Sequence, residues 1–286
     1  VTAIGEHACE GLDKVVQVDF SNDTTTVAEY AFSNCSSLET VTWAGLESIG
    51  EYAFNGCTSL RILTLTENVR DISSHAFDGC TGLKTVELGE NIQQMGTNVF
   101  SGCSAFNTLR INADVSDYAF SGCTGLSEVS VGNPSIRIGE NAFSGCTSLK
   151  FLNISDTVGE VGDGAFDGCT GLTSISIPQS VKSIGKKAFQ GCYALNDVQL
   201  SRITSIGSDA FHSVTVPEGV KEIGNYAFQN CTKLEKIVFN AGEGQLKIGS
   251  YSFSGCKVLR DIDLTIRVNE IGEHAFENCV ALSNVS

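Results

Sequence analysis

The chain has no run of 18 apolar residues anywhere in its 286 positions. A membrane-spanning helix requires such a run, so the sequence predicts no direct insertion into a membrane. The chain is also short of positive charge, because 18 lysines and arginines stand against 33 aspartates and glutamates, giving a formal charge of −15. This balance repels nucleic acid and anionic lipid. The small basic cluster of Lys182, Lys186 and Lys187 is interpreted as a solvated patch rather than a phosphate site.

The sequence also lacks the patterns that carry catalysis or metal binding. It contains no glycine-rich phosphate loop, no His-Glu-x-x-His and no Cys-x-x-Cys. The histidines His7, His75, His212 and His274 are widely separated, whereas a catalytic site needs acid, base and nucleophile to converge in one pocket. We therefore expect no enzymatic activity, no cofactor and no metal ion.

What the chain does have is one phrase that recurs along almost its whole length. It reads Ala76-Phe77-Asp78-Gly79-Cys80-Thr81-Gly82-Leu83, and again Ala142-Phe143-Ser144-Gly145-Cys146-Thr147-Ser148-Leu149. The usual step is 23 residues, as from Phe54 to Phe77. A fixed period of this size is typical of a solenoid, in which each coil contacts mainly its neighbours. The predicted fold is a single solenoid over residues 1–286.

One repeat predicts the shape of one coil. Leu60-x-x-Leu63-x-Leu65 alternates as a half-buried strand does, and Val69 with Ile72 suggests a short second extended piece. The segment from Ser73 to Phe77 is long enough for about one turn of α- or 3₁₀-helix. Stacked coils should then build a parallel sheet on one face, with short helical turns on the opposite face.

From Cys35 onward, the position before each repeated cysteine holds only glycine or asparagine. Its members are Asn34, Gly56, Gly79, Gly102, Gly122, Gly145, Gly168, Gly191, Asn230, Gly255 and Asn278. These two residues tolerate positive φ, so the pattern predicts a left-handed turn at this point of every coil. The 12 cysteines themselves share one slot, three residues before a leucine or phenylalanine. We interpret them as buried free thiols; the alternative, disulfides between neighbouring coils, suits parallel side chains poorly.

The combined motif is similar to the leucine-rich repeat of the BspA-like, or Treponema pallidum-type, family. Leu83-x-x-Val86-x-Leu88 with Ile92, Gly96, Phe100 and Cys103 carries the resemblance, which covers essentially the whole chain. It implies an α/β solenoid, a right-handed leucine-rich-repeat superhelix of about 12–13 coils. It also implies a cell-surface or secreted protein that adheres to matrix proteins or to other cells. The family offers no catalytic residues.

Three coils depart from the regular step. The interval from Phe100 to Phe120 is 20 residues, because Asn112-Ala113-Asp114 replaces a longer second strand. The coil at Phe211 loses the Gly-Cys segment, and the loop Gly242-Glu243-Gly244 lengthens a later coil. Such coils are interpreted either as decayed repeats or as functional protrusions on the surface of the solenoid.

Outward strand residues are the first candidates for a binding surface. The row is polar and rich in threonine and serine, with Arg110 in it and with Ile62, Phe151 and Val238 as apolar exceptions. Phe151 is the best single anchor, because aromatic side chains dominate interface hot spots. The alternative is that one exposed apolar residue has no function.

A second candidate surface is the position before Ala-Phe. It holds His7, Tyr30, Tyr52 and His75 in successive units near the start, and Tyr226, Tyr251 and His274 in the last three. These aromatic patches are interpreted either as a partner surface or as rings that stack between coils. Glycosylation sequons begin at Asn22, Asn34, Asn153, Asn230 and Asn284, and the first four are the candidate glycosylation sites. Asn34 and Asn230 also occupy the left-handed position, so backbone geometry explains them equally well.

Two functions remain open after the enzyme is set aside. The first is a non-catalytic binding or adhesion module that presents its polar sheet face to a protein or glycan. The second is a structural subunit of an extracellular filament, appendage or coat, which assembles with copies of itself through coil ends and lateral contacts. The chain enters in mid-unit at Val1 and stops within a strand at Ser286. We therefore expect it to be a segment of a longer array, or to be capped by a neighbour.

Overall fold

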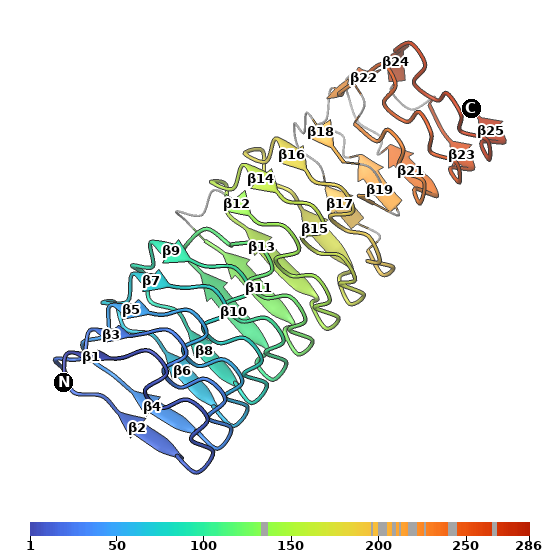
Figure 1. The fold of residues 1–286 in the computed structure, drawn as a ribbon. Coiled ribbons are helices and arrows are strands. Elements are labelled where there is room, and N and C mark those ends of the chain that lie inside the picture. Colours follow the sequence, from blue (N-terminus) through green and yellow to red (C-terminus); the bar gives the residue numbers. More distant parts are fainter. Residues whose placement is uncertain are drawn as a thin grey trace.

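The computed structural model describes residues 1–132, 137–195, 197–199, 205–207, 210–211, 213–216, 222–225, 227–239, 245–264 and 268–286. The chain coils into a long stack whose N- and C-terminal coils lie at opposite ends (Figure 1). Every strand pairing in the described residues is parallel and joins one coil to the next. The solenoid that the 23-residue step predicts is therefore confirmed.

The first row of strands follows the Leu-x-x-Val-x-Leu segments and forms one long face. Its members are β2 (Gln17–Asp19), β4 (Thr40–Thr42), β6 (Ile62–Thr64), β8 (Thr85–Glu87), β10 (Thr108–Ile111), β11 (Glu128–Val131), β13 (Phe151–Ile154), β15 (Ser174–Ser176), β17 (Asp197–Gln199), β19 (Ser213–Val216), β21 (Lys236–Phe239), β23 (Asp261–Ile262) and β25 (Asn284–Val285). Alternate residues point outward along it, as in β10, where Thr108 and Arg110 are exposed and Leu109 and Ile111 are buried. We call this row the sheet face.

The second extended pieces form a row of their own on another side of the stack. They are β1 (Ala3–Ile4), β3 (Thr26–Val27), β5 (Ser48–Ile49), β7 (Asp71–Ile72), β9 (Gln94–Met95), β12 (Arg137–Ile138), β14 (Glu160–Val161), β16 (Ser183–Ile184), β18 (Ser205–Ile206), β20 (Glu222–Ile223), β22 (Leu246–Ile248) and β24 (Val268–Ile271). The short coil after Phe100 contributes only a single bridge here, from Val115 to Ile138. This agrees with the loss of its second strand.

The expected helical turns opposite the sheet are wrong: the described residues contain no helix. In the turn Gly50–Cys57, alternate N–H groups donate in different directions. Those of Ala53, Asn55 and Cys57 donate back three residues within the turn, at 3.1–3.3 Å. Those of Tyr52, Phe54 and Gly56 donate instead to carbonyl oxygens of the next coil. A helix would direct every N–H along its own axis, so the turn exchanges helical bonds for bonds between coils.

Two left-handed positions per coil enforce this geometry. The glycine and asparagine column has positive φ throughout, from 59° at Asn34 to 79° at Gly255, as its composition predicts. A second column with positive φ lies four residues earlier, at the position before Ala-Phe. Its left-handed conformation was not predicted from the sequence. The column includes Tyr30 at 53°, Tyr52 at 55° and His75 at 58°. This column also holds Asn98, Asn141 and Gly164. Because asparagine and glycine tolerate positive φ, these residues were the sequence signal that could have revealed its left-handed conformation.

The core is a set of continuous side-chain ladders. Phe54 and Phe77 are fully buried, and their ring centroids lie 5.4 Å apart with nearly parallel planes. Of the twelve cysteines, eleven are buried and all are free thiols; Cys9 is half-buried. The thiol of Cys80 donates to the carbonyl oxygen of Phe54 at 3.1 Å. The eleven buried cysteines thus pack as small apolar groups that also satisfy a carbonyl of the preceding coil. Cys9 does not share their slot, contrary to the expectation from the sequence: its N–H donates to Ala31 as that of Phe32 donates to Ala53, so it occupies the phenylalanine position.

Candidate functional site

The sheet face exposes the apolar residues expected there. Phe151 is 68 % exposed, Ile62 58 % and Val238 36 %. Strand register then decides which candidates meet. Thr108, Glu128 and Phe151 lie side by side on β10, β11 and β13, and the next outward row is Arg110, Ser130 and Asn153. The structure thus brings Phe151 and Arg110 onto one three-stranded patch, whereas Ile62 on β6 and Val238 on β21 lie elsewhere along the face.

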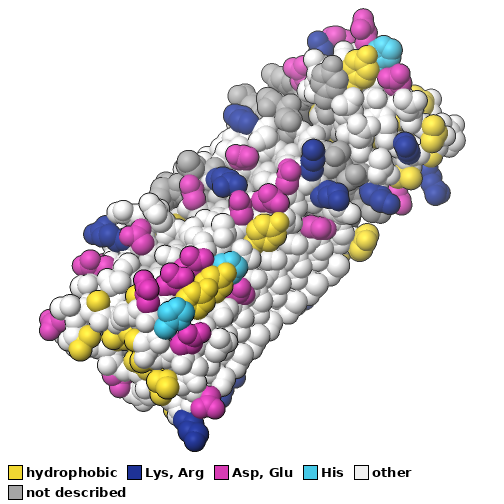
Figure 2. Space-filling view, in the orientation of Figure 1, with side chains coloured by type: hydrophobic (Ala, Val, Ile, Leu, Met, Phe, Trp, Pro, Cys, Tyr) yellow, Lys and Arg dark blue, Asp and Glu magenta, His cyan; other side chains and the backbone are white. Residues whose placement is uncertain are grey.

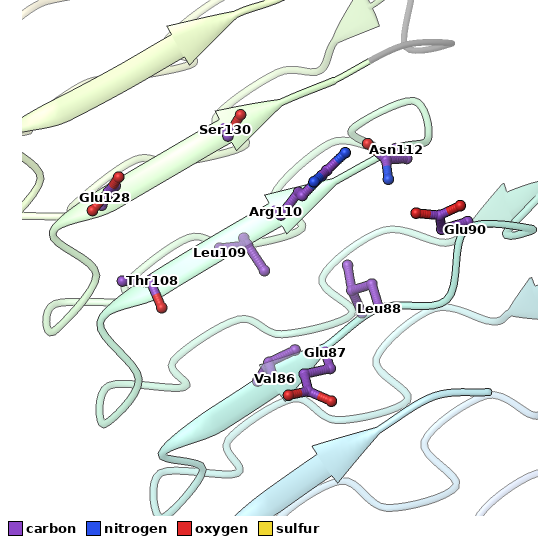
Figure 3. A pocket seen from close by; sticks show the side chains of 10 residues that line it. All are labelled: Val86, Glu87, Leu88, Glu90, Thr108, Leu109, Arg110, Asn112, Glu128 and Ser130. Carbon is purple, nitrogen blue, oxygen red and sulfur yellow. The ribbon is translucent and has the colours of Figure 1, made fainter. Parts of the chain in front are cut away.

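The face is hollowed between β8 and β10. A depression of about 430 Å³ opens there, lined by Val86, Glu87, Leu88, Glu90, Thr108, Leu109, Arg110, Asn112, Glu128 and Ser130 (Figure 3). Leu88 is half-buried and supplies an apolar part of the lining, while the charged side chains of Glu87, Arg110 and Glu128 are exposed. This hollow was not expected from the sequence, although Arg110 was.

The turn before β10 differs from the turns of the neighbouring coils. In the neighbouring coils, the leucine after the cysteine donates its N–H to the cysteine carbonyl, as Leu83 does to Cys80 at 3.2 Å and Leu126 to Cys123 at 3.1 Å. Phe106 takes this leucine position, is buried, and makes no such bond to Cys103. Across the described residues of β8 and β10, no backbone hydrogen bond joins the two strands. The larger ring thus accompanies an opened turn. The row of strands is also interrupted between β4 and β6 and between β13 and β15, where Leu60 and Leu172 do make the turn bond, so the interruption alone does not require a phenylalanine.

The charged side chains around the hollow form no ion pairs or hydrogen bonds with one another. Within the part of the chain that the structure describes, the guanidinium of Arg110 forms no hydrogen bond or ion pair, and neither do the carboxylates of Glu90 and Glu128. Glu87 accepts one hydrogen bond from the hydroxyl of Thr64, at 3.3 Å. Three carboxylates and one guanidinium thus surround the space, with the hydroxyl of Thr108 beside them. Donors and acceptors are both available to a ligand.

The aromatic column near the N-terminus forms a stacked surface ladder. The ring centroids of His7 and Tyr30 lie 4.9 Å apart, those of Tyr30 and Tyr52 4.8 Å, and those of Tyr52 and His75 4.5 Å. Figure 2 shows this strip with acidic side chains along it. Partial burial of the ring, with Tyr52 and the carboxylates of nearby glutamates, raises the pKa of Tyr30. The stacking matches the structural reading, because each ring contacts its neighbours through its faces.

The remaining predicted residues are placed as follows. Tyr251 stacks on His274 at 4.7 Å, and Tyr226 lies outside the described residues. All five sequon asparagines, including Asn284, are exposed. The side-chain amide of Asn34 donates to the hydroxyl of Ser33 at 3.1 Å, and a Cβ added to Gly56 would lie 2.7 Å from the amide oxygen of Asn34. Asn153 stands on β13 two residues after Phe151, so a glycan there would occupy the patch.

Two further features are absent from the described residues. No group of three or more histidine, cysteine, aspartate or glutamate side chains there is arranged to hold a metal ion. The same residues include no helix with the length and apolar character needed to cross a bilayer. The candidate residues that the structure brings together are the polar side chains and Phe151 on the sheet face.

Comparison with known proteins identifies the repeat. The family model of the BspA type leucine rich repeat region (6 copies) matches residues 1–107, 113–215 and 212–286. The chain belongs to the BspA-type leucine-rich repeat family. The resemblance expected from the Phe, Gly and Cys columns is therefore confirmed, and with it the leucine-rich-repeat class of the solenoid.

One solved structure shows the same fold, and two others are similar to the chain in sequence. A leucine-rich repeat protein from Bacteroides ovatus is 27 % identical to this BspA-type chain, with a TM-score of 0.73 over 100 % of this chain and 76 % of the other. A leucine rich cell surface protein from Faecalibacterium prausnitzii is 21 % identical, with a TM-score of 0.46 over 95 % and 87 % of the two chains. The T. pallidum leucine rich repeat protein is 31 % identical, with a TM-score of 0.38 over 54 % and 72 %. A search of curated proteins found no match.

Proposed function

We propose that this chain is the non-catalytic binding module of a cell-surface or secreted adhesion protein. Its sheet face carries the contact, centred on the patch formed by β10, β11 and β13. The observation that carries the proposal is Phe151, whose ring is 68 % exposed on a polar face beside the hollow at Arg110. Membership of the BspA-type family supports the surface location, and leucine-rich-repeat solenoids are scaffolds that offer an extended concave surface for binding.

The arrangement suits adhesion because the patch is rigid. Outward side chains project from hydrogen-bonded strands, so ligand binding orders few additional groups. An aromatic anchor surrounded by polar side chains is the usual composition of an interface hot spot. The patch also contains acceptors and donors in adjacent rows, in Glu128, Ser130 and Asn153.

The test compares variants that leave the fold intact. Phe151→Ser and Ile62→Ser remove exposed apolar groups from the sheet face, while Val280→Ser removes a side chain that is 78 % exposed in a turn elsewhere. Adhesion to cultured cells and to a panel of immobilised matrix proteins is measured, together with the melting temperature. We expect the sheet-face double variant to lose adhesion while its melting temperature stays near that of the parent, and Val280→Ser to bind normally.

Undiminished adhesion of the double variant would contradict the proposal and move attention to the aromatic ladder at Tyr30 and Tyr52. Light scattering over a concentration series tests the filament alternative with the same proteins. Growth of large particles that is unaffected by Phe151→Ser would favour assembly of copies through other surfaces.

A further inference from the structure

The hollow and the exposed ring of Phe151 form one continuous site. Register places Phe151 directly beside Glu128, and Glu128 with Ser130 lines the hollow. From β10 to β13 the patch spans two strand spacings, or about 10 Å. It therefore offers an aromatic face at one end and a depression of about 430 Å³ at the other. A ligand longer than a single ring could contact both ends.

We propose that this site binds a neutral oligosaccharide. The proposal rests on the proposed function and specifies its ligand. The first argument is hydrogen-bond chemistry: a guanidinium only donates and a carboxylate only accepts, whereas a hydroxyl does both. Neighbouring hydroxyls of one sugar can accept from Arg110 and donate to Glu128 or Glu90, groups that have no other partner in the described structure. A polyhydroxyl ligand thus satisfies both kinds of group without introducing charge.

The second argument is charge. The hollow has three carboxylates, Glu87, Glu90 and Glu128, against one guanidinium, and the whole chain has a formal charge of −15. This field repels sulfated or sialylated glycans. A cationic peptide would satisfy the carboxylates, but it would place positive charge beside the guanidinium of Arg110. A neutral ligand avoids both penalties.

The third argument is shape. Phe151 stands on a nearly polar face, with its ring free of any stacked neighbour among the described residues. An exposed aromatic face is a surface against which the C–H side of a pyranose packs, while its hydroxyls reach polar groups at the rim. Leu88 supplies a second apolar contact inside the hollow. The site thus has one apolar contact at each end, with polar side chains of β10 and β11 between them.

The experiment uses an array of immobilised neutral, sialylated and sulfated oligosaccharides, followed by calorimetric titration with the strongest neutral binder. Arg110→Leu, Glu128→Gln and Phe151→Leu alter the site. Arg70→Leu and Glu160→Gln make the same changes at exposed positions away from it, and Val280→Ser removes an exposed apolar side chain elsewhere. Thr108→Tyr fills the hollow without removing a charge. All variants are checked for an unchanged melting temperature.

We expect binding to neutral members of the array, with affinity lowered about tenfold or more by each site variant and by Thr108→Tyr, and unchanged by the three controls. Binding only to sialylated or sulfated members would overturn the proposal. So would displacement of the ligand by a lysine-rich peptide, or full binding by Thr108→Tyr. If no oligosaccharide binds while Phe151-dependent adhesion to a protein persists, this inference fails and the proposed function stands.

Discussion

The thiol of Cys146 donates a hydrogen bond to the backbone carbonyl of Phe120, 3.3 Å away in the preceding coil. The same contact recurs along the stack, for example from Cys169 to Phe143 at 3.2 Å. Desolvation by burial raises the pKa of Cys146 to about 12, and that of Cys57 to about 12 as well. The cysteine ladder therefore stays protonated in the folded protein at pH values where a free thiol ionises.

We predict cooperative loss of stability between about pH 9 and pH 12. The folded-state pKa values lie above those of the unfolded chain, so the stabilisation is fully present below the unfolded pKa and declines as the pH rises through that window. Urea unfolding at a series of pH values measures the effect. Cys146→Ser should reduce the slope by up to about 1.4 kcal/mol per pH unit, since one buried ionisable thiol is gone. An unchanged slope would show that this thiol is not protected.

The left-handed turn gives a prediction at Gly79, which has φ of 71° and no backbone atom closer than 3.9 Å to an added Cβ. Space is therefore available, and only the backbone conformation limits substitution. Gly79→Asn should be nearly neutral, whereas Gly79→Val should lower the free energy of unfolding by at least 1–2 kcal/mol, roughly the cost of a left-handed residue.

Gly82 supplies the contrast in the same coil. A Cβ there would lie 2.3 Å from the carbonyl oxygen of Thr58. Gly82→Asn should therefore destabilise the protein as strongly as Gly82→Val does. Thermal unfolding of the four variants distinguishes the two causes. Equal melting temperatures for Gly79→Asn and Gly79→Val would refute the conformational explanation.

The aromatic ladder gives a prediction at Tyr52, whose ring lies between those of Tyr30 and His75. Tyr52→Phe keeps both stacked pairs and should match the parent. Tyr52→Ala loses both pairs, each worth about 0.5–1.5 kcal/mol, and keeps a positive φ of 55° without compensation. Tyr52→Asn loses the rings but suits the backbone, so it should fall between the two. If Asn and Ala are equally destabilising, the backbone conformation contributes nothing.

The interrupted sheet gives a prediction at Phe106. Phe106→Leu restores the residue that the neighbouring coils use, so we expect the N–H of residue 106 to bond the carbonyl of Cys103 and the strands at Thr85 and Thr108 to approach each other. Hydrogen exchange at the amides of β8 and β10 should then slow. Unchanged exchange would show that the 20-residue step, rather than the phenylalanine, keeps the hollow open.

Much of this fold could be predicted because the residues in each column of the repeat meet a single physical requirement. Gly79 and its counterparts reveal the left-handed turn, and Cys80 beside an apolar ladder reveals burial. The prediction of a helical turn failed because the sequence shows only that the segment is short. It does not show that alternate N–H groups of the segment donate to the next coil, as that of Phe54 does to Ala76 at 2.8 Å. That choice depends on contacts between coils.

The candidate site, too, could be predicted only in part from the sequence. Period-two alternation predicts that Phe151 and Arg110 face outward, but only strand register places them on one patch. The hollow lies beside a turn in which Phe106 lacks the hydrogen bond that Leu83 and Leu126 make. Sequence marks Phe106 as a variant of the leucine column, yet the widened space appears only when three coils are packed together.

The most direct test of the binding account is adhesion of the Phe151→Ser protein. The parent, Phe151→Ser and Val280→Ser are titrated onto the same cells or oligosaccharide surface, and their melting temperatures are recorded in parallel. The account predicts that Phe151→Ser binds at least about tenfold more weakly at an unchanged melting temperature, while Val280→Ser binds as the parent does. Equal binding by all three proteins would contradict the assignment of the sheet face as the binding surface.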